Sequence, residues 1–373
     1  MIYLDYSATT PVSRKVLEED ALFHQRSFAN CNSIHALGKA ALEKVDKATN
    51  TILDILNLKD YSITYTSGAT ESNNLALKGI AFINKEQGKH IITTAFEHGS
   101  IVSCLNYLAN QGFEIDIVDI DDQGQVDLRH LQSLITDQTI LVSIGAVNSE
   151  LGIIQDLKKI KDITSQYPNI TFHSDMTQAV GKIKTDFSVV DLLSFSGHKI
   201  YGFKGIGALI HRKNIDLRPL IHGGKSLSKY RGGTPPTSLI YSLGIALEDI
   251  YKNFEEKEEK VKKLNLYLRN QLNTIKNIYI NSPINALANI LNFSLISSTS
   301  HQVQKYLSDK EIYVSTTSAC SSNQGFSRVV KVLTKDDLRS QSSIRVSISH
   351  LSEKTEIDAL INALEAYDES CKN

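Results

Sequence analysis

The chain has 373 residues, and its 40 Lys plus Arg nearly balance its 41 Asp plus Glu, which gives a formal net charge of −1. Nucleic acid and membrane surfaces are therefore not expected partners, because no overall field draws the chain toward a polyanion. Hydrophobic residues make up 41% and charged residues 22%, which excludes a disordered chain and suits about two globular domains.

The first residues carry no apolar run of signal-peptide length, and the chain has no apolar stretch of about 18 residues. We therefore expect a cytoplasmic protein without a membrane span. The cysteines show neither CxxC pairing nor a zinc-ligand spacing, so a disulfide scaffold and a structural metal are not expected. They are Cys31, Cys104, Cys320 and Cys371.

Short β-branched runs alternate with helical stretches through the first two thirds of the chain. This alternation predicts an α/β fold with a large, doubly wound, mostly parallel sheet. Helices are expected over 73–83 and 100–110, where apolar residues recur at intervals of three and four. The expected strands are Tyr61–Thr66, His90–Thr94, Glu114–Ile120, Ile140–Val147, Ile170–Ser174, Leu192–Ser196 and Ile206–His211.

A segment rich in Gly and Pro, His222–Pro236, closes the alternating region. The following stretch, Tyr241–Leu272, reads as helical and is expected to bridge two domains. Runs at Ile290–Ile296 and Ser343–Ser349 predict strands of a smaller α/β unit. We expect a large domain over 12–250 and a small domain built from 1–11 and 251–373.

The segment Ser194–Lys199 carries the strongest chemical signal. Lys199 follows an apolar run, so it is expected at the carboxyl end of a strand, where open α/β sheets bind ligands. Ser196 and His198 beside it can hold an anion, which favours a Schiff-base lysine. Asp175 also ends a predicted strand, and a carboxylate about 4 Å from a pyridine nitrogen favours its protonated form by roughly 4 kcal/mol. Together these residues indicate pyridoxal 5'-phosphate.

Two further strand ends carry polar groups. Thr66–Glu71 opens a helix, and backbone N–H groups at a helix start suit a phosphate. Thr234 is another candidate for holding that phosphate. His98 follows the run His90–Thr94 and can stack on a ring or move protons.

Two residues near the end of the chain are further candidates for chemistry. Cys320 lies in a loop of small polar residues, where a thiolate can form if a base or cation is near. Arg345 lies inside a β-like run and can clamp a carboxylate through two hydrogen bonds.

With these residues in place, the sequence resembles the cysteine desulfurases, fold type I enzymes that depend on pyridoxal 5'-phosphate and are similar to class V aminotransferases. The resemblance runs from end to end, and the order and spacing of its segments make it specific. The segments are 3–5, 8–11, 30–38, 66–74, 97–98, 148–152, 175 with 178, 194–199, 231–235, 318–321 and 343–347.

The resemblance implies a role for each matching residue. Lys199 would form a Schiff base with the cofactor, Asp175 would pair with the ring nitrogen, and Gln178 would contact the ring hydroxyl. His98 would stack on the ring and Arg345 would bind the carboxylate of L-cysteine. The phosphate would be held by Ala69, Thr70, Ser196 and His198, with Thr234 arriving from the neighbouring subunit of a homodimer.

The implied reaction converts L-cysteine to L-alanine and leaves the sulfur as a persulfide on Cys320. The loop around Cys320 resembles the long-loop group of the family, which hands sulfur to acceptor proteins of iron-sulfur cluster assembly or tRNA thiolation. The sequence departs from the family where Asn148-Ser149-Glu150 replaces Asn-Asn-Glu, so either Asn148 or Ser149 takes the substrate contact.

The residues leave two alternative functions open and disfavour a third. A selenocysteine lyase or another class V enzyme keeps the cofactor but changes the reaction, although Cys320 argues against a transaminase. A scaffold without catalysis would keep the fold as a docking surface for sulfur-transfer partners. A dinucleotide-binding dehydrogenase is disfavoured, because no GxGxxG follows the first predicted strand.

Overall fold

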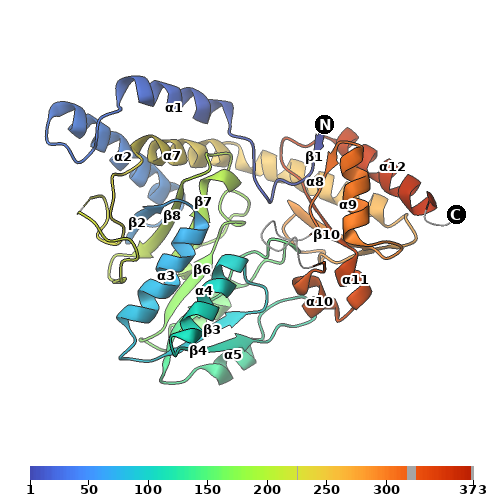
Figure 1. Ribbon diagram of the computed structural model, residues 1–373, viewed down its shortest axis with the longest axis horizontal. Helices are drawn as coiled ribbons and strands as arrows, with labels where there is room; N and C mark the ends of the chain where they lie inside the picture. Colours follow the sequence, from blue (N-terminus) through green and yellow to red (C-terminus); the bar gives the residue numbers. More distant parts are fainter. Residues whose placement is uncertain (225, 317–324, 371–373) are drawn as a thin grey trace.

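A seven-stranded sheet forms the larger part of the molecule (Figure 1). The computed structural model describes residues 1–224, 226–316 and 325–370. The strand order is β2-β8-β7-β6-β5-β3-β4. The strands are β2 (Tyr61–Thr66), β3 (His90–Thr94), β4 (Glu114–Val118), β5 (Thr139–Ser143), β6 (Thr171–Asp175), β7 (Leu192–Ser196) and β8 (Gly207–Arg212). All seven predicted strands are confirmed, with shifts of a few residues at their ends.

The sheet is mostly parallel, as predicted. Strands β4, β3, β5, β6 and β7 pair in parallel, whereas β8 runs antiparallel to both β7 and β2. Every residue of β3, β5 and β7 is buried, which explains why these strands read as continuous apolar or small-residue runs. Parallel pairing needs crossover connections, which are made by α3 (Ala69–Ile83), α4 (Gly99–Asn110), α5 (Leu128–Leu134) and α6 (Leu157–Thr164).

The other helices of this part lie together in Figure 1, where α1 (Arg14–Arg26) and α2 (Ala36–Ile55) pack on α7 (Thr237–Tyr251). The single helix expected over 241–272 is in fact two. Lys252 is extended and Asn253 adopts a left-handed backbone with φ 53°, so α7 stops at Tyr251 and α8 (Phe254–Leu272) begins as a separate helix. The sequence gives weak warning of this break, because the helix-favouring residues continue on both sides of it.

A second group of elements carries the other two predicted strands. A three-stranded antiparallel sheet has the order β12-β10-β9, and β1 (Ile2–Tyr3) pairs in parallel with β11 (Ile312–Tyr313). These elements share a separate apolar cluster, whose buried members are Leu4 and residues between 261 and 364. The remaining elements are β9 (Ile278–Ile280), β10 (Ile290–Leu295), β12 (Ser343–Ser347), α9 (Ser300–Asp309), α10 (Arg328–Thr334), α11 (Asp337–Gln341) and α12 (Lys354–Ser370).

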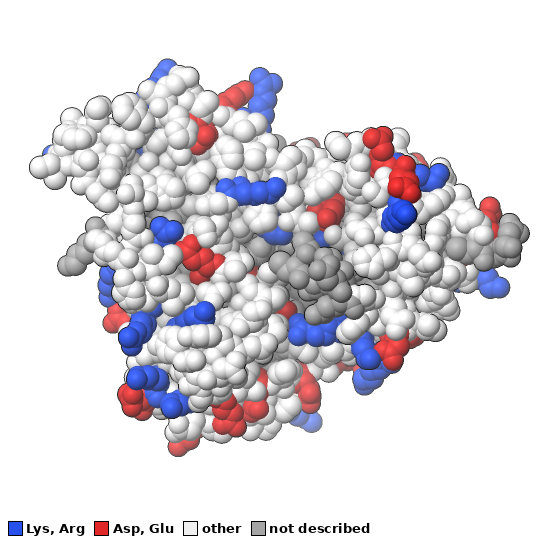
Figure 2. All heavy atoms as spheres, viewed as in Figure 1, with Lys and Arg blue, Asp and Glu red and all other residues white. Residues whose placement is uncertain are grey.

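The charges of the described residues follow the balanced composition. On the face drawn in Figure 2, basic and acidic side chains are interspersed over both groups of elements. Among the helices that the structure describes, none has the length and apolar composition to cross a bilayer.

Candidate active site

A cavity of about 400 Å³ opens at one edge of the large sheet. Residues just after β2, β3, β5, β6 and β7 line it, because the carboxyl ends of these strands meet at that edge. The second group of elements contributes Arg345 from β12. The predicted site residues that line this cavity are Ala69, Thr70, His98, Asn148, Asp175, Gln178, Ser196, His198, Lys199 and Arg345.

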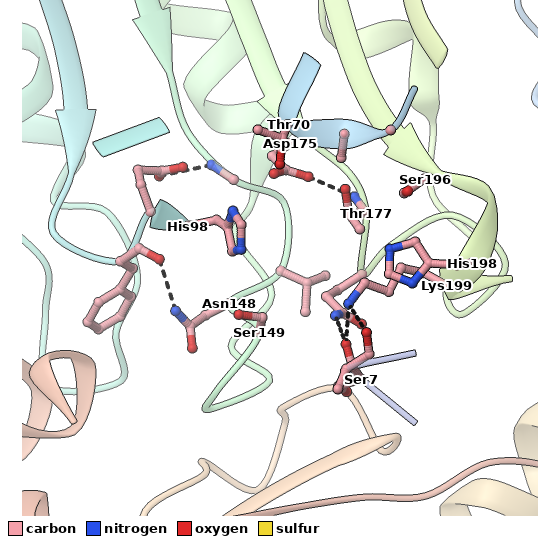
Figure 3. Close-up of a pocket in the computed structure, with 18 of the residues that line it drawn as sticks. Ser7, Thr70, His98, Asn148, Ser149, Asp175, Thr177, Ser196, His198 and Lys199 are labelled. Atoms are coloured by element: carbon pink, nitrogen blue, oxygen red, sulfur yellow. Dashed lines mark hydrogen bonds between the residues drawn. The ribbon is translucent and has the colours of Figure 1, made fainter. Parts of the chain in front are cut away.

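Lys199 lies in a short 3₁₀ turn, η2 (Gly197–Lys199), directly after β7. Its Nζ donates hydrogen bonds to the carbonyl oxygens of Ser7 at 2.6 Å and Ala8 at 2.7 Å (Figure 3). The N-terminal segment therefore crosses the mouth of the large sheet and holds the amine at the pocket wall. The sequence pointed to Lys199 but not to these two carbonyl groups.

Asp175 is the last residue of β6, and its carboxylate is held from two sides. Oδ2 accepts from Asn73 Nδ2 at 2.8 Å, and Oδ1 accepts from the backbone N–H of Thr177 at 3.0 Å. The Thr177 hydroxyl also lines the pocket and is buried without a hydrogen-bond partner among the described residues. A polar atom of this kind indicates that the pocket is built for a polar ligand.

The start of α3 forms a close backbone cradle. Its N-cap residue is Gly68, which supplies no side-chain cap to the first N–H groups of the helix. A Cβ on Gly207 of β8 would lie 2.6 Å from Gly68 Cα, so only glycine allows this approach. Ser196 lies beside Gly68, and together they place a hydroxyl next to a helix N-terminus, an arrangement suited to an anion.

His198 lies on the same side of the pocket. Burial, together with the neighbouring charges of Lys199 and Lys204, lowers its pKa to about 4, so the ring is neutral near pH 7. Its Nδ1 lies 3.1 Å from the Thr9 hydroxyl. If that hydroxyl donates to Nδ1, the neutral ring carries its proton on Nε2, where it can donate to an anion.

His98 caps the start of α4, and its ring points into the pocket in Figure 3. Its Nδ1 accepts from the backbone N–H of Ser100 at 3.2 Å, which fixes the ring orientation. The preceding residue, Glu97, is buried and accepts from Thr94 Oγ1 at 2.7 Å and Gly145 N at 3.0 Å. Burial raises the pKa of Glu97 to about 7, and the charge of Asp175 adds to this rise.

Arg345 is 1% exposed and its guanidinium is held in place by protein groups. Nη2 contacts Asp5 Oδ1 at 2.7 Å, and Nη1 donates to the Ser149 carbonyl at 3.0 Å. Its Nε is buried without a hydrogen-bond partner among the described residues. The guanidinium thus keeps a donor for a carboxylate in the pocket.

Asn148 and Ser149 both line the pocket, but their contacts differ. The Asn148 amide donates to the Phe96 carbonyl at 3.0 Å and accepts from the backbone N–H groups of Glu150 and Leu151. Its side chain therefore holds the turn, while Ser149 offers its carbonyl to Arg345.

The two remaining predicted site residues are Thr234 and Cys320. Thr234 is exposed and does not line the cavity. Cys320 lies in the segment 317–324, outside the described residues. Sequence reasoning gave no role to Thr177, Glu97 or Lys204, which also line the pocket.

Comparison with known proteins places this geometry in a family. The model of the family described as aminotransferase class-V matches residues 2–360. A protein named cysteine desulfurase IscS from Dictyoglomus turgidum is 36% identical over 376 residues, which cover 100% of this chain and 95% of that protein.

Two solved structures are also similar. One, described as a NifS-like protein, has a TM-score of 0.92 and 32% identity, with 99% of both chains covered. Another, SspA in complex with cysteine, has a TM-score of 0.82 and 32% identity, with 95% of this chain and 100% of that chain covered. These matches confirm the fold and the resemblance drawn from the sequence. The chain belongs to the aminotransferase class-V family.

Proposed function

We propose that this protein is a pyridoxal-phosphate-dependent cysteine desulfurase, which converts L-cysteine to L-alanine and retains the sulfur as a persulfide on Cys320. The observation that carries the proposal is the convergence of Lys199, Asp175 and Arg345 on one pocket of a class-V chain. The name of the IscS relatives and the solved complex of SspA with cysteine support cysteine as the substrate.

The pocket residues fit the cofactor in three places. The uncapped start of α3, with Ala69, Thr70, Ser196 and His198, suits its phosphate. The Asp175 carboxylate, already oriented by two donors, suits a protonated ring nitrogen. Lys199 supplies the amine for covalent attachment. The Thr177 hydroxyl, which bonds to none of the described residues, offers a further polar contact.

Bound pyridoxal phosphate supplies an electron-withdrawing ring that weakens the Cα–H bond of an attached amino acid. Asp175 keeps the ring nitrogen protonated, which strengthens this withdrawal. The Lys199 amine then takes the proton from Cα and returns one later. The His98 ring points into the pocket, where it would stack on the cofactor ring.

Arg345 fixes the substrate by its carboxylate, with Nε as a donor that has no partner in the part of the chain that the structure describes. Cys320, as a thiolate, attacks the substrate sulfur. An S–S bond forms, the Cβ–S bond breaks with its electron pair passing to carbon, and protonation of that carbon gives alanine.

We propose further that the active unit is a homodimer in which Thr234 reaches the phosphate of the neighbouring subunit. Thr234 is exposed on its own chain, as such a role requires. Several large apolar side chains on the segment around α1 and α2 are also exposed: Phe28 at 72%, Ile34 at 91% and Leu37 at 57%. A second copy that covers these side chains would remove them from water.

The persulfide would pass to acceptor proteins of iron-sulfur cluster assembly or tRNA thiolation, in line with the resemblance of the sequence around Cys320 to the long-loop group. Capture of persulfide-labelled protein from cell extract would identify the acceptor.

Reduction of the cofactor-loaded protein with borohydride, followed by peptide mapping, tests the proposed function. We expect the cofactor on Lys199. A label on Lys204, which lines the same pocket, or no label at all contradicts the proposal.

The Cys320→Ala variant tests the sulfur acceptor separately. It should bind the cofactor like the wild type but form no persulfide from cysteine. Formation of alanine at the wild-type rate would show that Cys320 is not the nucleophile.

A further inference from the structure

A second lysine, Lys182, lies behind Lys199 and has no part in the chemistry proposed above. It stands in the turn that follows β6, four positions after Gln178. Lys182 and Lys199 both line a small cavity of about 30 Å³, and Lys182 is not among the residues lining the main pocket. A lysine in this position needs an explanation, since burial of its amine is unfavourable.

Hydrogen bonds connect the two lysines through the backbone of Ser7. Lys182 Nζ donates to Gln178 Oε1 in a short hydrogen bond, and Gln178 Nε2 donates to the Ser7 carbonyl at 3.0 Å. Lys199 Nζ donates to the same Ser7 carbonyl. Gln178 is 4% exposed, so its amide depends on these neighbours for its hydrogen bonds.

The orientation of the Gln178 amide follows from the chemistry of its two partners. The Ser7 carbonyl only accepts, so it requires the amide nitrogen, and Lys182 Nζ donates to the amide oxygen on the other side. A flipped amide would set its oxygen against the Ser7 carbonyl oxygen. The Nε2 group therefore stays on the side of Ser7 and Lys199, where Gln178 lines the main pocket.

The charges around Lys182 are mostly positive. Burial, followed by the charges of Lys199 and Arg345, lowers the pKa of its amine well below the ordinary value. The ionisable residues that share its small cavity are Lys199, Tyr201, Lys257, Glu258 and His350.

We infer that Lys182 is a positioning residue, which fixes the Gln178 amide so that N–H donors rather than the carbonyl face the ring hydroxyl oxygen of the bound cofactor. This inference rests on the proposed function. A hydrogen-bond donor at that hydroxyl oxygen favours its ionised form. The bound cofactor therefore loses its proton at a lower pH when Lys182 is present.

The visible absorption of the cofactor-loaded protein, titrated with pH, tests this inference without measuring turnover. In Lys182→Met the amide loses one of its two constraints, and the midpoint of the absorption change should rise by about one pH unit, a tenfold change in the equilibrium. Lys182→Arg keeps the donors and should titrate near the wild type. An unchanged midpoint in Lys182→Met would overturn the inference.

Lys184→Met is the matched control, because Lys184 lies two positions away and pairs with Glu255 at the surface. Its midpoint should equal that of the wild type. Gln178→Leu should show an upward shift of its own, and adding Lys182→Met to it should cause no further rise. Full addition of the two shifts would mean that Lys182 does not act through Gln178.

The outcomes also separate this inference from the proposed function. A wild-type protein that binds no pyridoxal phosphate defeats the proposed function. A wild type that binds and titrates, with the same midpoint in Lys182→Met, leaves the function standing and rejects only the role of Lys182. If Lys182→Met fails to fold, Lys182→Arg takes its place in the test. An absorption midpoint in Lys182→Arg as high as that in Gln178→Leu would then reject the role of Lys182 and leave the proposed function standing.

Discussion

Glu97 shows how burial of one carboxyl group links stability to pH. Its folded pKa of about 7 lies above the ordinary value of 4.5, so the native state binds this proton more tightly than the unfolded state. The resulting penalty is absent below pH 4.5, grows between pH 4.5 and 7, and is complete above pH 7. Stability contributed by this residue therefore falls as pH rises.

We expect Glu97→Gln to lack this penalty. Between pH 5 and pH 8 the free energy of unfolding of the wild type should fall by about 2.5 kcal/mol relative to the variant. Urea unfolding of the cofactor-free proteins at the two pH values measures this difference. A constant difference between the two proteins would show that Glu97 stays ionised across the range.

Arg345 offers a second test at a single side chain. Arg345→Lys keeps a positive charge but loses the planar fork that Asp5 and Ser149 hold in place. We expect kcat/KM for cysteine to fall about 100-fold, as loss of a charge-assisted contact of about 2.7 kcal/mol implies, while the cofactor remains bound. Arg212→Lys, at an ion pair with Asp191 away from the pocket, is the control. Equal kinetics in the two variants would remove Arg345 from the substrate site.

The start of α3 depends on its close contact with β8. In Gly207→Ala the new Cβ would meet the backbone of Gly68, and neither strand nor helix start can move without breaking the sheet. We expect the affinity for pyridoxal phosphate to fall at least tenfold, measured by equilibrium dialysis. Gly224→Ala, where a Cβ meets nothing within 4 Å, should bind normally. Wild-type affinity in Gly207→Ala would exclude the cradle as the phosphate site.

At the scale of single elements, the tertiary structure decides two features. They are the break between α7 and α8 and the path of the N-terminal segment across the sheet. Helix-favouring residues stand on both sides of Asn253, and only the tertiary structure shows that the helix is interrupted there. Likewise, Ser7 and Ala8 reach Lys199 because β1 pairs with β11, a contact between residues some 310 positions apart.

For the whole molecule, we propose that residues 12–250 and the pair of segments 1–11 and 251–373 form two units. The apolar cluster built from Leu4 and residues 261–364 supports this division, since it is separate from the clusters beneath the large sheet. Arg345 then belongs to one unit and Lys199 to the other, so the pocket forms only when both are folded together.

The exposed apolar side chains around α1 and α2 offer a test of the proposed homodimer. Phe28→Glu places a charge among side chains that a second copy is expected to cover, so the protein should become a monomer in light scattering and lose affinity for pyridoxal phosphate. Leu338→Glu, at a residue 64% exposed on α11, should leave both properties unchanged. A dimeric Phe28→Glu protein would place the interface elsewhere.

By itself, the sequence determined the strands of the large sheet, the helices α3 and α4 and most of the polar groups at the pocket wall, because alternating runs and polar strand ends are local signals. The residues that orient those groups came only from the tertiary structure. Asp5 on Arg345, Ser7 on Lys199 and Lys182 on Gln178 are contacts set by how strands and turns pack. Their physical cause is the need of buried polar groups for partners, which depends on spatial neighbours rather than on spacing along the chain.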